Sequence, residues 1–110
     1  MLSDLCLYHG NLSVPENEQA VVWLLKNVFS TVELPLIISG KRPSTRLIRL
    51  IDQNPLACLI ADPSEEELRD LIAKAQVNIL PSFNCTGIKL KLLNALYNGR
   101  HCIEIGRAHV

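Results

Sequence analysis

The sequence predicts an α/β protein built on a doubly wound parallel, Rossmann-like sheet. Three observations carry this prediction: short apolar, β-branched runs alternate with segments of helical periodicity, turn residues separate the two, and the alternation repeats through most of the 110 residues. Five strands alternating with four helices imply right-handed βαβ crossovers. We therefore expect three layers, α/β/α, with the sheet truncated after about five strands.

The first half of the chain is predicted to form two strand–helix pairs. A strand over residues 5–8 precedes a helix, whose start we place at a capping box formed by Ser13 and Glu16. A second strand is expected over residues 35–40, because an unbroken apolar run is typical of a strand buried on both faces. A helix over residues 44–52 follows, with apolar residues on one face.

The second half continues the alternation. A third strand is expected over residues 56–61, and a second capping box, Ser64 and Glu67, opens the next helix. That helix is expected to direct four apolar side chains inward, namely Leu68, Leu71, Ile72 and Ala75. The remaining elements are a fourth strand over residues 77–80 that Pro81 ends, a helix over about 90–97, and a fifth strand that begins at residue 100.

Composition bounds the class of protein. Hydrophobic residues make up 48% of the chain and charged residues 20%, which rules out disorder and fits one compact domain. The 11 basic residues balance the 11 acidic ones and aromatic residues make up only 5%, which argues against a nucleic-acid binder. The four cysteines lack zinc or disulfide spacing, so we interpret them as small buried hydrophobes in a reducing compartment, with Cys85 alone exposed.

The last seven residues differ in character from the rest. Residues 104–110 break the apolar run that begins at Cys102 and resemble a translated sequencing adapter, so we interpret them as foreign to the natural chain. The alternative is a genuine polar tail. The predicted domain then covers residues 1–103, and the natural chain is interrupted at Ile103, within a strand. On this interpretation the sequence is a fragment of a longer protein.

Ligands of such sheets bind outside the carboxyl ends of the strands, so the loops that follow the strands form the candidate site. Four loops qualify, at residues 8–11, 39–43, 61–63 and 81–87. The last loop leads into a helix whose amino terminus attracts anions, Gly87 lets a phosphate approach, and Lys89 and Lys91 add positive charge. These features favour a phosphorylated ligand, although the glycine-rich dinucleotide and P-loop motifs do not occur in the sequence.

Two ring-bearing side chains have both a structural and a functional interpretation. His9 follows a strand and could orient a sugar or a base, but a lone histidine more often makes local hydrogen bonds. Trp23 lies at core spacing on the first predicted helix, which favours a packing role.

Three segments occur in an order and at spacings that are more specific than the fold. They are residues 8–12 followed by Pro15, Asn17 and 22–24, residues 37–43, and residues 78–82 followed by 86–96 and Gly99. In the last segment a strand ends at Pro-Ser, a glycine turn opens a helix, and a further glycine leads into the next strand. Together these segments resemble the carboxy-terminal, donor-binding half of the retaining group 1 glycosyltransferases of GT-B fold, over nearly all of residues 8–103.

The resemblance implies a function. Members of that family bind a nucleotide-diphosphate sugar in a cleft between two Rossmann-like domains and transfer the sugar with retention, usually without a metal ion, so neither cofactor nor metal is implied. The implied partners are the nucleotide-sugar donor and the missing amino-terminal, acceptor-binding domain of the parent chain, without which the fragment is expected to be inactive. The residues expected to bind the donor are Gly10, Asn11, Lys41, Arg42, Ser82, Thr86, Gly87, Ile88, Lys89 and Asn94.

The sequence also departs from the family pattern. The paired glutamates of the family are replaced here by Thr86 and Asn94. Asn94 can still accept hydrogen bonds from ribose hydroxyls, but without charge assistance, and Thr86 keeps only a hydroxyl. No residue is therefore assigned a catalytic role. The alternative function is a non-catalytic Rossmann-like nucleotide-binding or interaction module, and a third interpretation is an orphan fragment with an exposed sheet edge.

The sequence carries no apolar run near the roughly 20 residues that span a bilayer. Reduced cysteines and the soluble nucleotide donors of the family lead us to expect a cytoplasmic enzyme. Peripheral association of the parent enzyme with the inner face of the membrane is a further expectation.

Overall fold

The computed structural model describes residues 5–82 and 101–106, with residues 80–82 and 101–106 described as backbone only. Strands and helices alternate in the predicted order as far as the fourth strand. The elements, in chain order, are β1 (Cys6–His9), α1 (Pro15–Asn27), β2 (Leu36–Gly40), α2 (Thr45–Asp52), β3 (Ala57–Ala61), α3 (Glu65–Lys74), β4 (Val77–Ser82) and β5 (His101–Gly106).

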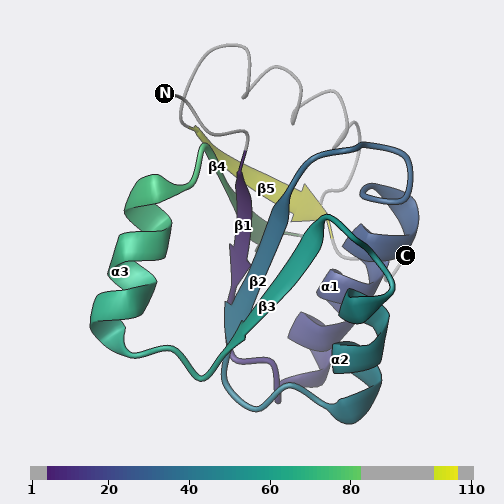
Figure 1. The fold of residues 1–110 in the computed structure, drawn as a ribbon, viewed down its shortest axis with the longest axis horizontal. Helices are drawn as coiled ribbons and strands as arrows, with labels where there is room; N and C mark the ends of the chain where they lie inside the picture. The colour runs from purple at the N-terminus through teal and green to yellow at the C-terminus, as the bar shows by residue number, and fades with distance from the viewer. Residues whose placement is uncertain (1–4, 83–100, 107–110) are drawn as a thin grey trace.

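The strands form one parallel sheet in the order β3-β2-β1-β4-β5. The chain moves outward from β1 to β2 and β3, then returns to the other side of β1 to form β4, so the direction of winding reverses at β1. Figure 1 shows α1 and α2 on one side of the sheet and α3 on the other. The predicted doubly wound, three-layer α/β/α fold is confirmed. Ligands of such sheets bind beside the reversal point, at the carboxyl ends of the strands.

The main hydrophobic core lies between the sheet and the pair of helices α1 and α2. Successive side chains of a strand point to opposite faces, so alternate residues of the central strands face this core. Trp23 packs against the core while remaining partly exposed, which confirms its packing role. The buried side chains of the core include Cys6, Tyr8, Leu36, Ile38, Val77 and Ile79 from the strands, Ala20, Val21, Leu24 and Leu25 from α1, Val28 and Phe29 from the turn after it, and Leu47 and Ile51 from α2.

The opposite face of the sheet is covered more thinly. No side chain within α3 is fully buried. Leu68 and Leu71 are half-buried, whereas Ile72 is 37% exposed, so the expectation that Ile72 faces inward is wrong. The apolar stripe of α3 is narrower than the usual stripe of a surface helix, and Ile72 lies at its solvent-facing margin.

The cysteines do not share one environment. Cys6 is fully buried, as predicted, but Cys58 is exposed as a free thiol, so its prediction as a buried hydrophobe is wrong. Cys58 lies on β3, which ends the sheet on that side, and it alternates with Ala57 and Leu59, which pack toward the main core. Its side chain therefore points to the thinly covered face. The side chains of the other two cysteines lie outside the described residues.

The predicted helix starts have different outcomes. Ser64 and Glu67 form the predicted capping box: the Glu67 N–H donates to Ser64 Oγ (3.1 Å) and the Ser64 N–H donates to Glu67 Oε1 (2.9 Å). The capping box predicted at Ser13 and Glu16 is wrong, because the N-cap of α1 is Val14, whose side chain offers no acceptor. Ser13 instead donates through its N–H and its Oγ to Asn11 Oδ1, at 3.0 and 2.6 Å.

β4 runs two residues further than predicted, through Pro81 to Ser82, so Pro81 does not end the strand. Proline is tolerated there because β1 pairs with β4 only as far as Ile79, and the missing N–H costs no hydrogen bond on that side.

β5 extends three residues past Ile103, and Gly106 is in register with Ser82. Residues 104–106 thus continue a parallel strand, while their foreign origin stays a prediction. The predicted helix over residues 90–97 and the loop before it lie outside the described residues.

Candidate functional site at the carboxyl edge of the sheet

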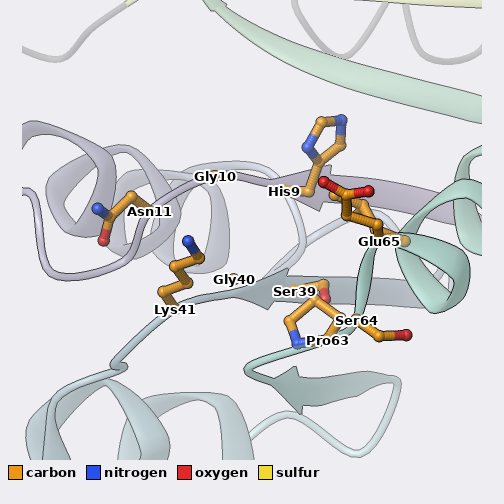
Figure 2. Close-up of a pocket in the computed structure, with 10 residues that line it drawn as sticks. His9, Gly10, Asn11, Ser39, Gly40, Lys41, Pro63, Ser64 and Glu65 are labelled. Carbon is orange, nitrogen blue, oxygen red and sulfur yellow. The ribbon is translucent and has the colours of Figure 1, made fainter.

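A pocket of about 360 Å³ opens at the carboxyl edge of the sheet. Three of the four loops predicted to form the site meet there: those after β1, β2 and β3, together with the first turns of α3. Figure 2 shows the residues from these segments that lie around the pocket. The described residues that line the pocket are His9, Gly10, Asn11, Ser39, Gly40, Lys41, Pro63, Ser64, Glu65 and Leu68.

The loops after β1 and β2 are joined through their backbones. The Gly10 N–H donates to the Ser39 carbonyl (3.1 Å), and the Leu12 N–H donates to the Lys41 carbonyl (3.0 Å). The two chains approach so closely that a Cβ on Gly40 would lie 1.7 Å from the Gly10 carbonyl oxygen. Only glycine fits at position 40 without movement of the backbone. The pocket is therefore lined here by two backbone segments in close contact.

Gly10 has a different environment. A Cβ on Gly10 would lie 3.5 Å from Asn17 Nδ2, which is ordinary van der Waals contact. The fold does not require glycine at this position. Room for a ligand remains the predicted reason for glycine here.

The loop after β3 is joined to the loop after β2. The Asp62 N–H donates to the Gly40 carbonyl (2.8 Å), and the Arg42 N–H donates to Asp62 Oδ1 (3.1 Å). Arg42 and Asp62 both have left-handed backbone, with φ of 50° and 51°. For residues other than glycine this conformation is uncommon, although aspartate adopts it more readily than arginine. The hydrogen bonds between the loops hold both residues there.

Asn11 stabilises its own loop. Its side-chain oxygen accepts both hydrogen bonds from Ser13, and its carbonyl accepts one from Asn17 Nδ2 (3.0 Å). In Figure 2 the Asn11 amide points away from the other labelled side chains. The Asn11 side chain is therefore engaged in hydrogen bonds within its own loop in this structure.

The charges of the described lining are balanced. Lys41 and Glu65 are exposed and enter from opposite sides of the pocket in Figure 2. Burial lowers the pKa of the His9 imidazole below its ordinary value, which favours the neutral form of the ring. Among these lining residues, Lys41 is the side chain that can attract a phosphate, and Glu65 is one that can accept hydrogen bonds from hydroxyl or amine groups.

The predicted donor-binding residues are distributed unevenly. Gly10, Asn11 and Lys41 line the pocket, whereas Arg42 does not. Ser82 ends β4, and nothing is described of its side chain. The others lie outside the described residues, and their roles stay predictions: Thr86, Gly87, Ile88, Lys89 and Asn94.

Several lining residues were not predicted as binding residues. The sequence contained a signal for one group, because the Ser64 and Glu67 capping box follows directly after the third strand and so places the start of α3 at the same edge. Glu65 could have been inferred from that position. The role of Gly40 depends on a close approach to Gly10, which no local pattern reveals.

Among the described residues, no group of three or more histidine, cysteine, aspartate or glutamate side chains is placed to hold a metal ion. No helix in that part of the chain is long and apolar enough to cross a membrane.

Comparison with known proteins assigns the family. The family model of the group 1 glycosyl transferases matches residues 3–107, which is nearly the whole chain. The chain belongs to this family. The predicted resemblance to the group 1 glycosyltransferases is thereby confirmed, and the match includes the loops that line the pocket.

The chain is also similar to an uncharacterized 44.6 kDa protein in the cps region of Klebsiella pneumoniae. The two are 33% identical over 103 residues, which cover 84% of this chain and 26% of the relative. The chain thus spans about a quarter of that relative's length. No solved structure matches the chain significantly.

Proposed function

We propose that this glycosyltransferase domain binds the nucleotide-diphosphate sugar donor, with the pocket at the carboxyl edge as part of the donor site. The observation that carries the proposal is the position of Lys41. It lines a pocket beside the reversal point of the sheet, where doubly wound folds bind ligands. A cation at that position can offset part of the negative charge of a diphosphate.

The backbone of the pocket supports this role. Gly10 and Lys41 both line the pocket, and Gly10 leaves space there because it has no side chain. The lack of a side chain at Gly40 allows the loops after β1 and β2 to lie close together. A cation that is already held in place stabilises a developing anion better than a mobile one, because no reorganisation of the site is needed during the reaction. In the parent enzyme, Lys41 would stabilise the departing nucleoside diphosphate in this way.

The finer features of the reaction belong to the same proposal. We expect transfer with retention and without a metal ion, to a glycan, lipid or other acceptor that a further domain of the parent enzyme holds. The residues from Thr86 to Lys89 would complete the diphosphate site, and Asn94 would accept a hydrogen bond from the donor ribose. Cytoplasmic location, free or at the inner membrane face, follows from the use of soluble nucleotide donors.

Titration with nucleoside diphosphates tests the proposal. Calorimetric titration of the chain with UDP, GDP and ADP, and then with the matching nucleotide sugars, should identify at least one ligand. Lys41→Glu should weaken the binding of that ligand by about 1–3 kcal/mol, because a charge-assisted contact becomes a repulsion. The matched control is Lys26→Glu, which makes the same charge change in the last turn of α1, at the opposite edge of the sheet.

Two results would contradict the proposal. One is an unchanged isotherm for Lys41→Glu, and the other is an equal loss in both lysine variants, which would indicate a general charge effect. If nucleotides bind but the parent enzyme transfers and hydrolyses no nucleotide sugar, the non-catalytic binding module becomes the better interpretation. The activity assay on the parent enzyme is necessary because Thr86 and Asn94 stand in place of the family glutamates.

A further inference from the structure

Two of the hydrogen bonds around Lys41 involve the same residue, Asp62. Asp62 lies one residue beyond β3, and it bonds to both peptide groups that flank Lys41. Its N–H donates to the Gly40 carbonyl (2.8 Å), which belongs to the peptide before Lys41, and its Oδ1 accepts from the Arg42 N–H (3.1 Å), which belongs to the peptide after it. The orientation of the Lys41 Cα–Cβ bond follows from these two peptide planes.

The third hydrogen bond on this turn comes from the other side. The Lys41 carbonyl accepts from the Leu12 N–H (3.0 Å), so the peptide between Lys41 and Arg42 is held at both of its polar groups. Arg42, at a φ of 50°, has a backbone conformation that arginine seldom adopts without support. The bond from its N–H to a carboxylate is charge-assisted and therefore among the stronger hydrogen bonds in the loop.

From this geometry we propose that Asp62 is a positioning residue for donor binding. It does not line the pocket, but it holds the turn that directs Lys41 into it. The inference rests on the proposed function, in that Lys41 is taken to contact the donor phosphates. Asp62 suits this position because aspartate tolerates a φ of 51° and carries an acceptor on a short side chain.

Three substitutions separate the contributions of Asp62. Asp62→Asn keeps an acceptor and the tolerance for left-handed backbone, so the Kd for the bound nucleoside diphosphate should stay within about threefold of wild type. Asp62→Gly keeps only the backbone freedom, and Asp62→Ala keeps neither, so both should weaken binding about tenfold. Asp52→Asn and Asp52→Ala, at the exposed end of α2, are the matched controls and should leave the Kd unchanged.

A double-mutant cycle tests whether Asp62 acts through Lys41. Asp62→Ala should weaken binding in the wild-type chain but cause no further loss in a Lys41→Ala background, because no lysine remains to be positioned. A full loss in both backgrounds would overturn the proposal, as it would show that Asp62 affects the pocket independently of Lys41. Wild-type affinity in Asp62→Gly would also overturn it, because the carboxylate would then have no effect.

A measurement without ligand keeps this proposal distinct from the proposed function. Amide hydrogen exchange at Arg42 should be slow in wild type and in Asp62→Asn, and fast in Asp62→Gly and Asp62→Ala, with exchange in β1 unchanged. If wild type binds none of the nucleotides, the proposed function fails, while slow exchange that depends on the Asp62 acceptor would still show that Asp62 holds the turn. Fast exchange at Arg42 in wild type would overturn the positioning role whatever the binding result.

Discussion

Two glycines line the pocket, and their neighbours differ. Gly40 has no space for a side chain because the Gly10 carbonyl oxygen occupies the position of its Cβ. Gly10 itself has room for a methyl group, with Asn17 Nδ2 at contact distance. One glycine is thus required by the fold, and the other is available for a ligand. This difference allows stability and binding to be tested separately.

Gly40→Ala should destabilise the chain by about 3 kcal/mol, because a methyl group forces the two backbones apart. Gly10→Ala should change the free energy of unfolding by less than about 0.5 kcal/mol, yet weaken nucleotide binding if the diphosphate approaches there. Urea unfolding followed by circular dichroism measures the first effect, and calorimetry the second. Equal unfolding midpoints for the two variants would contradict the close approach at Gly40.

At the scale of single elements, the helix starts show what a sequence pattern can and cannot predict. The sequence predicts capping boxes at Ser13 and at Ser64, and only the one at Ser64 forms. At α1, Pro15 occupies the first helical position and Ser13 lies too far upstream to be the N-cap. The backbone N–H of Ser64 donates a hydrogen bond that lowers the pKa of the Glu67 carboxyl below its ordinary value, as a reciprocal cap should.

Ser64→Ala should destabilise the chain by about 1 kcal/mol, because it removes the acceptor for the Glu67 N–H at the start of α3. Ser13→Ala is the matched control and should cost less than about 0.5 kcal/mol, since its backbone N–H still bonds to Asn11. Chemical denaturation of both variants measures the two changes in the free energy of unfolding. A larger loss of stability for Ser13→Ala than for Ser64→Ala would contradict the prediction, because the loop before α1 would then contribute more to stability than the cap of α3.

At the scale of the whole molecule, the alternation of strands and helices was sufficient to predict the layers, and the rule for carboxyl edges was sufficient to predict which loops meet. The basic turn also allowed Lys41 to be predicted as a pocket residue. Periodicity could not show that β3 ends the sheet and exposes Cys58, because strand order depends on pairing between distant segments. It could not reveal the bonds of Asp62 to the Lys41 turn for the same reason.

The 110-residue chain by itself should bind a nucleotide sugar without transferring or hydrolysing it. The expected reason is that binding uses the pocket described here, whereas transfer also requires an acceptor held next to the donor sugar, which no described residue of this pocket provides. Incubation with radiolabelled nucleotide sugars, followed by separation of the products, measures this. Turnover by the chain that disappears in Lys41→Glu would contradict the prediction.

The pocket has one further property that follows from the order of the strands. All its described lining residues fall within positions 9–68, and β1 lies closer along the chain to its partner β2 than to its partner β4: Cys6 is in register with Leu36 on one side and with Val77 on the other. Short loops close at a lower entropic cost, and structure made of local contacts folds faster. The pocket therefore belongs to the part of the fold with the more local contacts. We expect it to form during synthesis, before the fourth strand has been translated.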